Sequence, residues 1–304
     1  MERNILKDRF VYYTVRLFGV LCRILNKNTA MFLAKGIGLL LFYTLKKRRE
    51  IALQNLMIAF QDKITKIEQV KICKDSFINL SKTVVEFMRF PKLNYKNIWE
   101  EVTIIGREHL DTAMKSGKGT IVFLPHFGNW ELLSLVYGVL IPNQAKAIAL
   151  PLKNKQLNDM IWRFRQLFSL ELIPRKNAVK ESLRALRNNQ AVGFFADQNA
   201  GEHGVFIDFF GKPASTVRGP VTLALKTESP ILFSLDIRNP DGSHKVEILP
   251  PIYTKSSGDL ESDVKHYTSL LLKHLEHYIH KYPDQWLWIH NRWKTQPGNT
   301  NDNS

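Results

Sequence analysis

The chain is poor in cysteine, with only Cys22 and Cys73 among its 304 residues. Two cysteines cannot build a disulfide framework, and neither stands at a metal-ligand spacing. The sequence also lacks internal repeats, long linkers and the Gly-x-Ser-x-Gly elbow that carries a nucleophilic serine. We therefore expect reducing surroundings for most of the chain, no metal site and no nucleophile of the serine-hydrolase type.

Acidic residues are scarce, because 28 Asp and Glu stand against 43 Lys and Arg, a net charge of +15. Residues 1 to 50 hold eleven of the basic residues and three of the acidic ones, a local charge of +8. This position favours an anionic membrane surface as partner, and a generally basic, soluble exterior is the alternative. Nucleic acid is not expected as a partner, since the excess coincides with apolar helices and no reading motif is present.

A long hydrophobic run is missing too. The most apolar N-terminal segment, Ala30 to Leu45, is interrupted by Lys35 and would be roughly 24 Å long as a helix, short of a roughly 30 Å hydrocarbon core. Nor do we recognise a cleaved secretory leader. We expect residues 1–48 to form two amphipathic helices in or on the cytoplasmic leaflet, closed by the basic cluster 46–49. A helical hairpin packed on the core is the alternative.

Hydrophobic residues make up 44% of the chain, ample for a buried core. Residues 50 to 90 carry apolar positions at helical spacing, and from about residue 102 short apolar runs alternate with amphipathic stretches. The pattern predicts strands at Val102–Ile105, Thr120–Leu124, Lys146–Leu150, Leu170–Pro174, Ala191–Ala196, Ile231–Ile237 and Lys245–Leu249. It predicts helices at about 130–140, 154–168, 176–189, 217–227 and 262–281.

This alternation is typical of βαβ units. We therefore expect an α/β fold with a mixed, mainly parallel central sheet flanked by helices, formed by residues 49–294. The N-terminal segment, 1–48, would be the membrane-associated helical part. The polar residues 295–304 would be a disordered tail.

The clearest chemical signal is the run from His126 to Glu131, which follows a predicted strand. On one ideal helix, side chains five positions apart would point about 140° away from each other, so the pair needs a bend between them. Gly128 supplies the backbone freedom, and Asn129 can cap the helix that follows. Glu131 would then hold the imidazole in one tautomer and leave the other nitrogen to accept a proton. A hydrogen-bonded structural histidine is the alternative.

Asp197 and Gln198 form a second candidate, because they also follow a predicted strand. Ligands of an open α/β sheet bind where strands end and helices begin. Asp197 would support the site, and a loop carboxylate that caps a turn is the alternative.

Five blocks in order resemble the lysophospholipid acyltransferase superfamily and, within it, the lipid A biosynthesis acyltransferases that add lauroyl or myristoyl chains. The His-x4-acid signature stands as His126 to Glu131. The other blocks are Arg48-Arg49 with Ala52 and Asn55-Leu56; Arg163, Arg165 and Ile173-Pro174-Arg175; Asp197-Gln198 with Gly201, Gly204 and Phe209-Phe210-Gly211; and Pro283 to Lys294 with its three tryptophans.

The resemblance implies transfer of a fatty acyl chain from a thioester to a hydroxyl of a membrane glycolipid, most simply a Kdo-lipid A precursor. Acyl carrier protein would be the donor and partner, with acyl-CoA as the other possible co-substrate, and no cofactor is required. The expected place is the cytoplasmic face of a bacterial inner membrane, among anionic lipids. Another lysophospholipid, aminolipid or glycolipid acceptor stays open, as do a lipid or thioester hydrolase and a non-enzymatic basic membrane-binding protein.

Within this reading, His126 is the general base and Glu131 orients it, with Asn129, Asp197 and Gln198 in support. Arg163, Arg165 and Arg175 would bind phosphate groups of the acceptor or the acidic carrier, since guanidinium groups match phosphate geometry. Arg163 and Arg165 are two apart on a predicted helix and cannot face the same way, and we favour Arg163. Oxyanion donors would be backbone amides after His126 or a nearby arginine.

Overall fold

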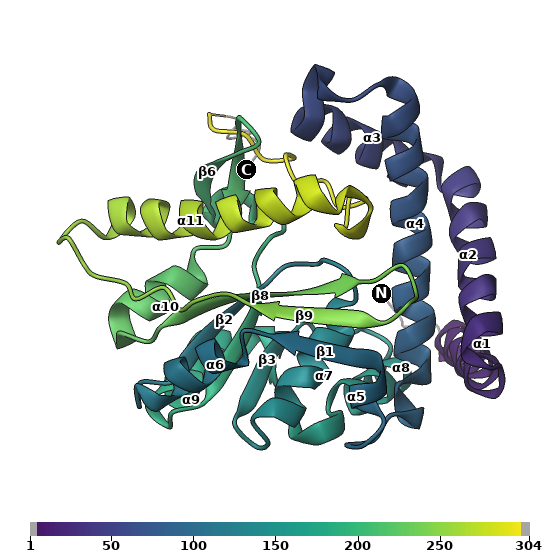
Figure 1. Ribbon diagram of the computed structural model, residues 1–304, viewed down its shortest axis with the longest axis horizontal. Coiled ribbons are helices and arrows are strands. Elements are labelled where there is room, and N and C mark those ends of the chain that lie inside the picture. The colour runs from purple at the N-terminus through teal and green to yellow at the C-terminus, as the bar shows by residue number, and fades with distance from the viewer. Residues whose placement is uncertain (1–4, 299–304) are drawn as a thin grey trace.

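A seven-stranded sheet lies at the centre of the computed structural model, which describes residues 5–298 (Figure 1). The strand order is β1-β9-β8-β2-β5-β3-β4, and every neighbouring pair is parallel except β8 and β9. The strands are Val102–Ile105 (β1), Thr120–Leu124 (β2), Ala145–Ala149 (β3), Glu171–Pro174 (β4), Ala191–Phe195 (β5), Ile231–Arg238 (β8) and His244–Ile248 (β9). The expected α/β fold with a mainly parallel sheet is confirmed, and each predicted strand end lies within one residue of the observed end.

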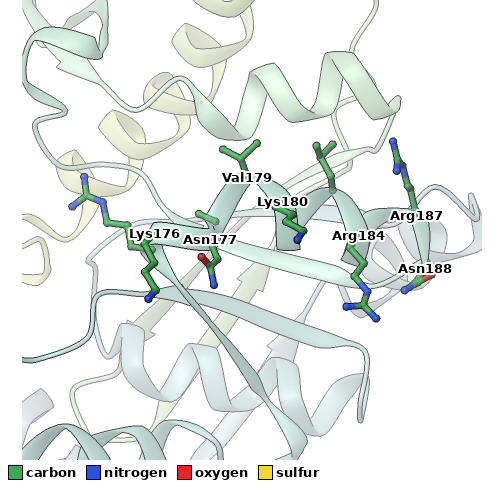
Figure 2. Close-up of a pocket in the computed structure, with 10 residues that line it drawn as sticks. Lys176, Asn177, Val179, Lys180, Arg184, Arg187 and Asn188 are labelled. Atoms are coloured by element: carbon green, nitrogen blue, oxygen red, sulfur yellow. The ribbon is translucent and has the colours of Figure 1, made fainter. Parts of the chain in front are cut away.

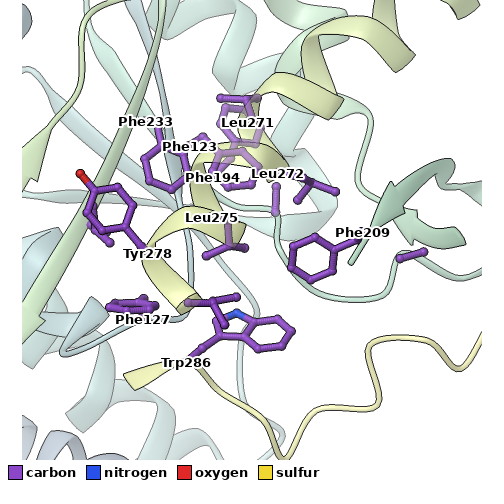
Figure 3. Packing of buried hydrophobic residues seen from close by; sticks show 14 of the residues in the cluster. Phe123, Phe127, Phe194, Phe209, Phe233, Leu271, Leu272, Leu275, Tyr278 and Trp286 are labelled. Atoms are coloured by element: carbon purple, nitrogen blue, oxygen red, sulfur yellow. The ribbon is translucent and has the colours of Figure 1, made fainter. Parts of the chain in front are cut away.

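Side chains alternate across the sheet and feed two hydrophobic clusters. In β2, Ile121 and Phe123 belong to the cluster that includes the helices at 178–187, 219–227 and 260–281 (α11), whereas Val122 and Leu124 belong to the cluster that includes the helices at 107–115 and 130–140. Figure 3 shows the first of these, where phenylalanines of the sheet meet leucines of α11. The helices of this part are Ile98–Glu101 (α5), Arg107–Lys115 (α6), Trp130–Leu140 (α7), Lys155–Arg165 (α8), Ala178–Arg187 (α9), Gly219–Thr227 (α10) and Leu260–Lys281 (α11).

A two-stranded antiparallel hairpin of β6 (Val205–Phe209) and β7 (Lys212–Thr216) stands apart from the main sheet and packs on α11. Its turn residues Phe210 and Gly211 both have positive φ, of 56° and 75°. The sequence pattern did not predict this hairpin. Phe209 is fully buried beside Trp286 and Trp293, and Phe210 is buried next to it, while Gly211 is exposed.

The first four helices of the described chain are α1 (Ile5–Ile24), α2 (Lys27–Thr44), α3 (Lys46–Phe60) and α4 (Lys66–Arg89). The long helix α4 begins with a capping box between Thr65 and Glu68 and carries α1 and α2 along its side (Figure 1). Gly38 of α2 lies so close to α4 that an added Cβ would stand 2.5 Å from the Cα of Ile78. The two N-terminal helices are therefore docked on the α/β body, and the predicted boundary at residue 48 falls inside α3.

Within residues 5–298, no single helix is both long and apolar enough to cross a bilayer. One pair, Lys27–Thr44 and Lys46–Lys63, passes the same test together but is bent by 90°. Both N-terminal helices nevertheless expose large apolar side chains, among them Leu6, Phe10, Leu17 and Ile24 of α1 and Phe32 and Leu40 of α2.

Short 3-10 segments complete the described chain: Gln61–Lys63, Phe90–Lys92, Leu167–Ser169, Arg175–Asn177, Gly201–His203 and Pro283–Gln285. At the C-terminal end, the Thr295 hydroxyl accepts a hydrogen bond from the side-chain Nδ2 of Asn199 at 3.1 Å. Residues 295–298 of the predicted tail are described, and its residues 299–304 lie outside the described residues.

Candidate active site

The turn between β2 and α7 has the predicted geometry. Asn129 caps α7, with its Oδ1 accepting a hydrogen bond from the Leu132 amide at 3.0 Å. Gly128 has φ +56°, and a Cβ there would lie 2.2 Å from the carbonyl oxygen of Asp236. Glycine is thus required at this bend on both conformational and packing grounds. The turn leaves His126 at the carboxyl end of the sheet.

His126 is held by Asp197, which lies just after β5, the strand next to β2. The ring Nδ1 is 2.7 Å from Asp197 Oδ1, and the backbone amide of His126 donates to Oδ2 at 2.9 Å. Trp286 donates its indole Nε1–H to the same Oδ2 at 2.9 Å. Burial alone would raise the pKa of Asp197, but His126 and these donors hold it below its usual range.

An ionised carboxylate can only accept hydrogen bonds, so the proton between the two residues belongs to Nδ1 of His126. The other ring nitrogen, Nε2, is then a proton acceptor. The His126 side chain keeps 18% of its surface exposed, while that of Asp197 keeps 1%. Trp130 and Phe195 pack around the ring, with centroid distances of 5.3 and 5.1 Å. The arrangement can act as a general base.

Glu131 does not hold the ring, contrary to the expectation from sequence. Both of its oxygens are engaged by Arg165, whose Nε and Nη2 donate at 2.8 and 2.5 Å. Burial would lower the pKa of Arg165, but Glu131 raises it, so the guanidinium stays charged. The reason is that the two carboxylates approach from different directions. Asp197 enters from the neighbouring strand and takes the ring nitrogen, while Glu131 points from the first turn of α7 toward α8.

The structure places Arg165, and not Arg163, beside the motif. Arg163 is on an exposed part of α8, where its Nε donates to the carbonyl of Asp159 at 3.1 Å. Arg175 is exposed at the start of α9, beyond β4 at the edge of the sheet. Gln198 is half-buried beside Asp197. Of the three arginines, Arg165 is the one that contacts the His126 to Glu131 motif.

The first three backbone amides after His126 are already used. Phe127 donates to the Pro125 carbonyl, Gly128 donates to the Gln285 carbonyl, both at 2.9 Å, and Asn129 donates to Asp236 Oδ1 at 2.6 Å. These three amides are therefore not available as oxyanion donors. Arg165 uses two of its three nitrogens on Glu131, which leaves Nη1.

A buried polar network lies beneath the turn and was not predicted. Asn129 donates its side-chain amide to Glu86 at 2.7 Å, and Glu86 is ion-paired with Arg238. His244 contacts Asp236 through Nδ1 at 2.9 Å and approaches Glu86 at 3.5 Å. Burial would lower the pKa of His244, but the two carboxylates raise it to about 9.

The same opposition sets the charge of Glu86. Burial would raise its pKa, yet Arg238 and His244 hold it well below the usual range. A sequence signal for this network existed, since Asp236 and Arg238 interrupt an apolar strand and buried charges require partners.

The C-terminal block completes the site. The amide of Leu287 donates to the His126 carbonyl at 3.1 Å. His290 Nε2 accepts a hydrogen bond at 3.1 Å from the backbone N–H of Asn199, which lies two residues beyond Asp197. Arg292 is fully buried and donates to Ser215 and Thr216, and burial lowers its pKa to about 10. Trp286, Trp288 and Trp293 are buried, and Trp286 packs against both of the other rings.

The sequence is similar to a family model and to several known proteins. The family model described as bacterial lipid A biosynthesis acyltransferase matches residues 3–295. The lipid A biosynthesis palmitoleoyltransferase of Escherichia coli is 27% identical over 272 residues, 88% of this chain and 85% of the relative. The lauroyltransferase of the same pathway and organism is 25% identical over 265 residues, 86% of this chain and 84% of the relative.

A phosphatidylinositol mannoside acyltransferase of Mycobacterium tuberculosis is 29% identical over 153 residues, 48% of each chain. The matched segment thus spans about half the length of this relative. The family model, by contrast, takes in both N-terminal helices, the His126 turn and the C-terminal block. By that match, this chain belongs to the bacterial lipid A biosynthesis acyltransferase family.

Proposed function

We propose that the protein transfers a fatty acyl chain from a carrier thioester to a hydroxyl group of a membrane glycolipid, most simply a Kdo-bearing lipid A precursor. The observation that carries the proposal is the 2.7 Å contact between His126 Nδ1 and Asp197, which leaves Nε2 as a base at the carboxyl end of the sheet. The family supports acyl transfer, and the names of the Escherichia coli relatives favour the lipid A acceptor.

In the proposed reaction, Nε2 of His126 takes the proton of the acceptor hydroxyl as its oxygen attacks the thioester carbonyl. The tetrahedral intermediate collapses, the carbon–sulfur bond breaks, and the departing thiolate receives that proton from the imidazolium. The products are an ester and a free thiol, so protons and charge balance. Asp197 keeps the ring in one tautomer and stabilises its positive charge. General-base help of this kind is worth roughly 10²–10⁴-fold in rate.

Arg165 takes the electrostatic part in this proposal. Its Nη1 is a donor beside the motif that the pair with Glu131 does not use. A guanidinium donor aimed at the developing oxyanion, or at a phosphate of the acceptor, stabilises negative charge in a site partly shielded from water. Glu131 would thus act by fixing Arg165, and its part in the His-x4-Glu motif is to position that arginine.

The proposed place of action is the cytoplasmic face of the bacterial inner membrane. Exposed apolar side chains on α1 and α2 stand beside the basic residues of the N-terminal segment, a combination that favours an anionic lipid interface. Leu150 and Leu152, in the loop after β3, are also 63% and 42% exposed. The side chain of Asn154 links this loop to α1 through the Asp8 carbonyl at 2.7 Å.

The test is mass spectrometry of detergent-solubilised protein incubated with acyl carrier protein thioesters, acyl-CoA and a tetra-acylated Kdo-bearing lipid A precursor. A mass gain of one acyl chain with wild type, absent with His126→Ala, is the expected result. If the precursor is untouched while a mannosylated phosphatidylinositol or a bacterial lipid extract gains a chain, the acceptor is wrong and acyl transfer stands. Thioester loss with no acylated lipid would identify a hydrolase instead.

A further inference from the structure

A basic face runs along α9, from its approach at the end of β4 to its last turn. Five cations lie in this stretch and all are exposed: Arg175, Lys176, Lys180, Arg184 and Arg187. They line an open hollow of about 910 Å³ (Figure 2). Spacings of four residues place Lys176, Lys180 and Arg184 on one side of this helical stretch. Figure 2 shows Lys176 and Arg184 extending to the same side, away from Val179.

None of these five cations takes part in an ion pair with any residue of the described range 5–298. Other exposed cations do find partners, such as Lys118 with Glu228 and Lys71 with Asp75. Like charges three and four residues apart on a helix repel each other, so the arrangement is unfavourable for α9 alone. An external acidic surface would relieve that repulsion.

The start of this face and His126 both lie at the carboxyl ends of the strands. Pro174 ends β4 in register with Ala149, the last residue of β3. In the order β2-β5-β3-β4, three strand spacings separate β4 from the strand that leads to His126. At about 4.8 Å each, this is about 14 Å along the edge. A protein docked on α9 could therefore present a flexible thioester arm to the base.

The distribution of apolar side chains argues for a protein partner on this face. Large exposed apolar residues gather on α1 and α2, while α9 contributes Val179 alone. Figure 1 shows α9 on the side of the molecule away from α1 and α2. A membrane-binding face combines apolar with basic residues, whereas an acidic protein surface needs charge complementarity.

We propose that the basic face of α9 docks the acidic acyl carrier that delivers the thioester. The proposal rests on the proposed function, because it names the surface that receives the donor. Docking of this kind raises the rate of encounter and weakens as salt screens the charges. It should not matter for a small thioester that carries the same acyl chain and no acidic protein.

The experiment compares wild type with Lys180→Glu/Arg184→Glu in the full chain. Acyl transfer is measured with an acyl carrier protein thioester and with the acyl-pantetheine thioester of the same chain. A matched control, Lys265→Glu/Lys273→Glu, makes the same charge change on exposed positions of α11. The expected result is at least a tenfold rise in KM for the carrier protein in the α9 variant alone, with KM for acyl-pantetheine unchanged.

Equal KM values for the carrier protein in wild type and the α9 variant would overturn the docking site while leaving acyl transfer intact. So would an equal rise in the α11 control, which would mean that net charge alone matters. Loss of vesicle binding by the α9 variant, with carrier use unchanged, would assign the face to lipid and overturn the proposal. If wild type transfers a chain from neither thioester, the proposed function itself fails.

Discussion

Asp197 receives hydrogen bonds from both the imidazole ring and the backbone amide of His126, at 2.7 and 2.9 Å. One carboxylate thus fixes the position of the residue as well as the orientation of its ring. The two residues are 71 positions apart and meet because β2 and β5 are parallel neighbours. Adjacent parallel strands place their carboxyl ends together, which brings the base and its partner to one edge.

Replacement of Asp197 by asparagine should lower kcat by roughly 10²–10⁴-fold. The asparagine amide would favour the tautomer in which the proton sits on Nε2, so the nitrogen that faces solvent could no longer accept one. His126→Ala should cause a loss in the same range. Steady-state acyl transfer measures the effect, and circular dichroism checks the fold. Glu202→Gln, an exposed carboxylate on the following loop, is the control. Near-normal kcat in Asp197→Asn would show that Asp197 is not needed to orient His126 as the general base.

Glu131 and Arg165 should behave as a unit in a double-mutant cycle. Either Glu131→Gln or Arg165→Met disrupts the paired hydrogen bonds between them, so the double variant should lose no more kcat/KM than the more damaging single variant. Arg163→Met, on the exposed part of the same helix, should stay near wild type. Multiplicative losses would mean that Glu131 acts on His126 independently of Arg165.

His244 should make the stability of the protein depend on alkaline pH. Its pKa is raised in the folded chain from 6.5 to about 9, so its contribution is complete below pH 6.5 and disappears as the pH rises through about 9. A shift of this size corresponds to roughly 3 kcal/mol. Urea unfolding between pH 6.5 and pH 9.5 measures it. His244→Gln should be less stable at pH 6.5 and should lose less stability over that interval; an equal loss in both proteins would contradict the assignment.

Phe10→Glu/Leu17→Glu should weaken membrane association. These side chains are 72% and 71% exposed on α1, and burying one in lipid is worth about 1.5–3 kcal/mol. We expect at least about a tenfold lower partition into anionic vesicles in a flotation assay. Ile67→Glu, at an 83% exposed position near the start of α4, is the control. An unchanged partition of the α1 variant, or an equal fall in the control, would show that α1 does not contact lipid through these side chains.

The sheet could be predicted closely because its strands are short, largely apolar runs, and at Thr120–Leu124 a glycine and a proline bound the run. Helix α6 could not, since Arg107–Lys115 is mostly polar and buries only Leu110 and Ala113. The β6–β7 hairpin could not be predicted because its turn lacks the usual sequence signal. Phe210 takes a positive φ without the Asn-Gly or Asp-Gly pair that usually signals such a turn.

The parts of the site that depend on neighbouring residues in the sequence could be predicted. The bend at Gly128 and the cap at Asn129 follow from the order of residue types along a few positions. The pairing of His126 with Asp197 and of Glu131 with Arg165 depends on which strands and helices become neighbours. Sequence spacing does not contain that information, so the motif suggested the wrong partner for the ring.

The segment from Gln285 to Leu287 has a consequence for how the protein is made. The Gln285 carbonyl accepts a hydrogen bond from the Gly128 amide, and the Leu287 amide donates one to the His126 carbonyl. Between them, the indole of Trp286 donates a hydrogen bond to Asp197. A ribosome releases the chain in sequence order, so the strand that carries His126 emerges long before this segment does. The base can reach its final geometry only when the late segment has arrived, and a nascent chain that stops before it should already have its early helices yet be unable to react.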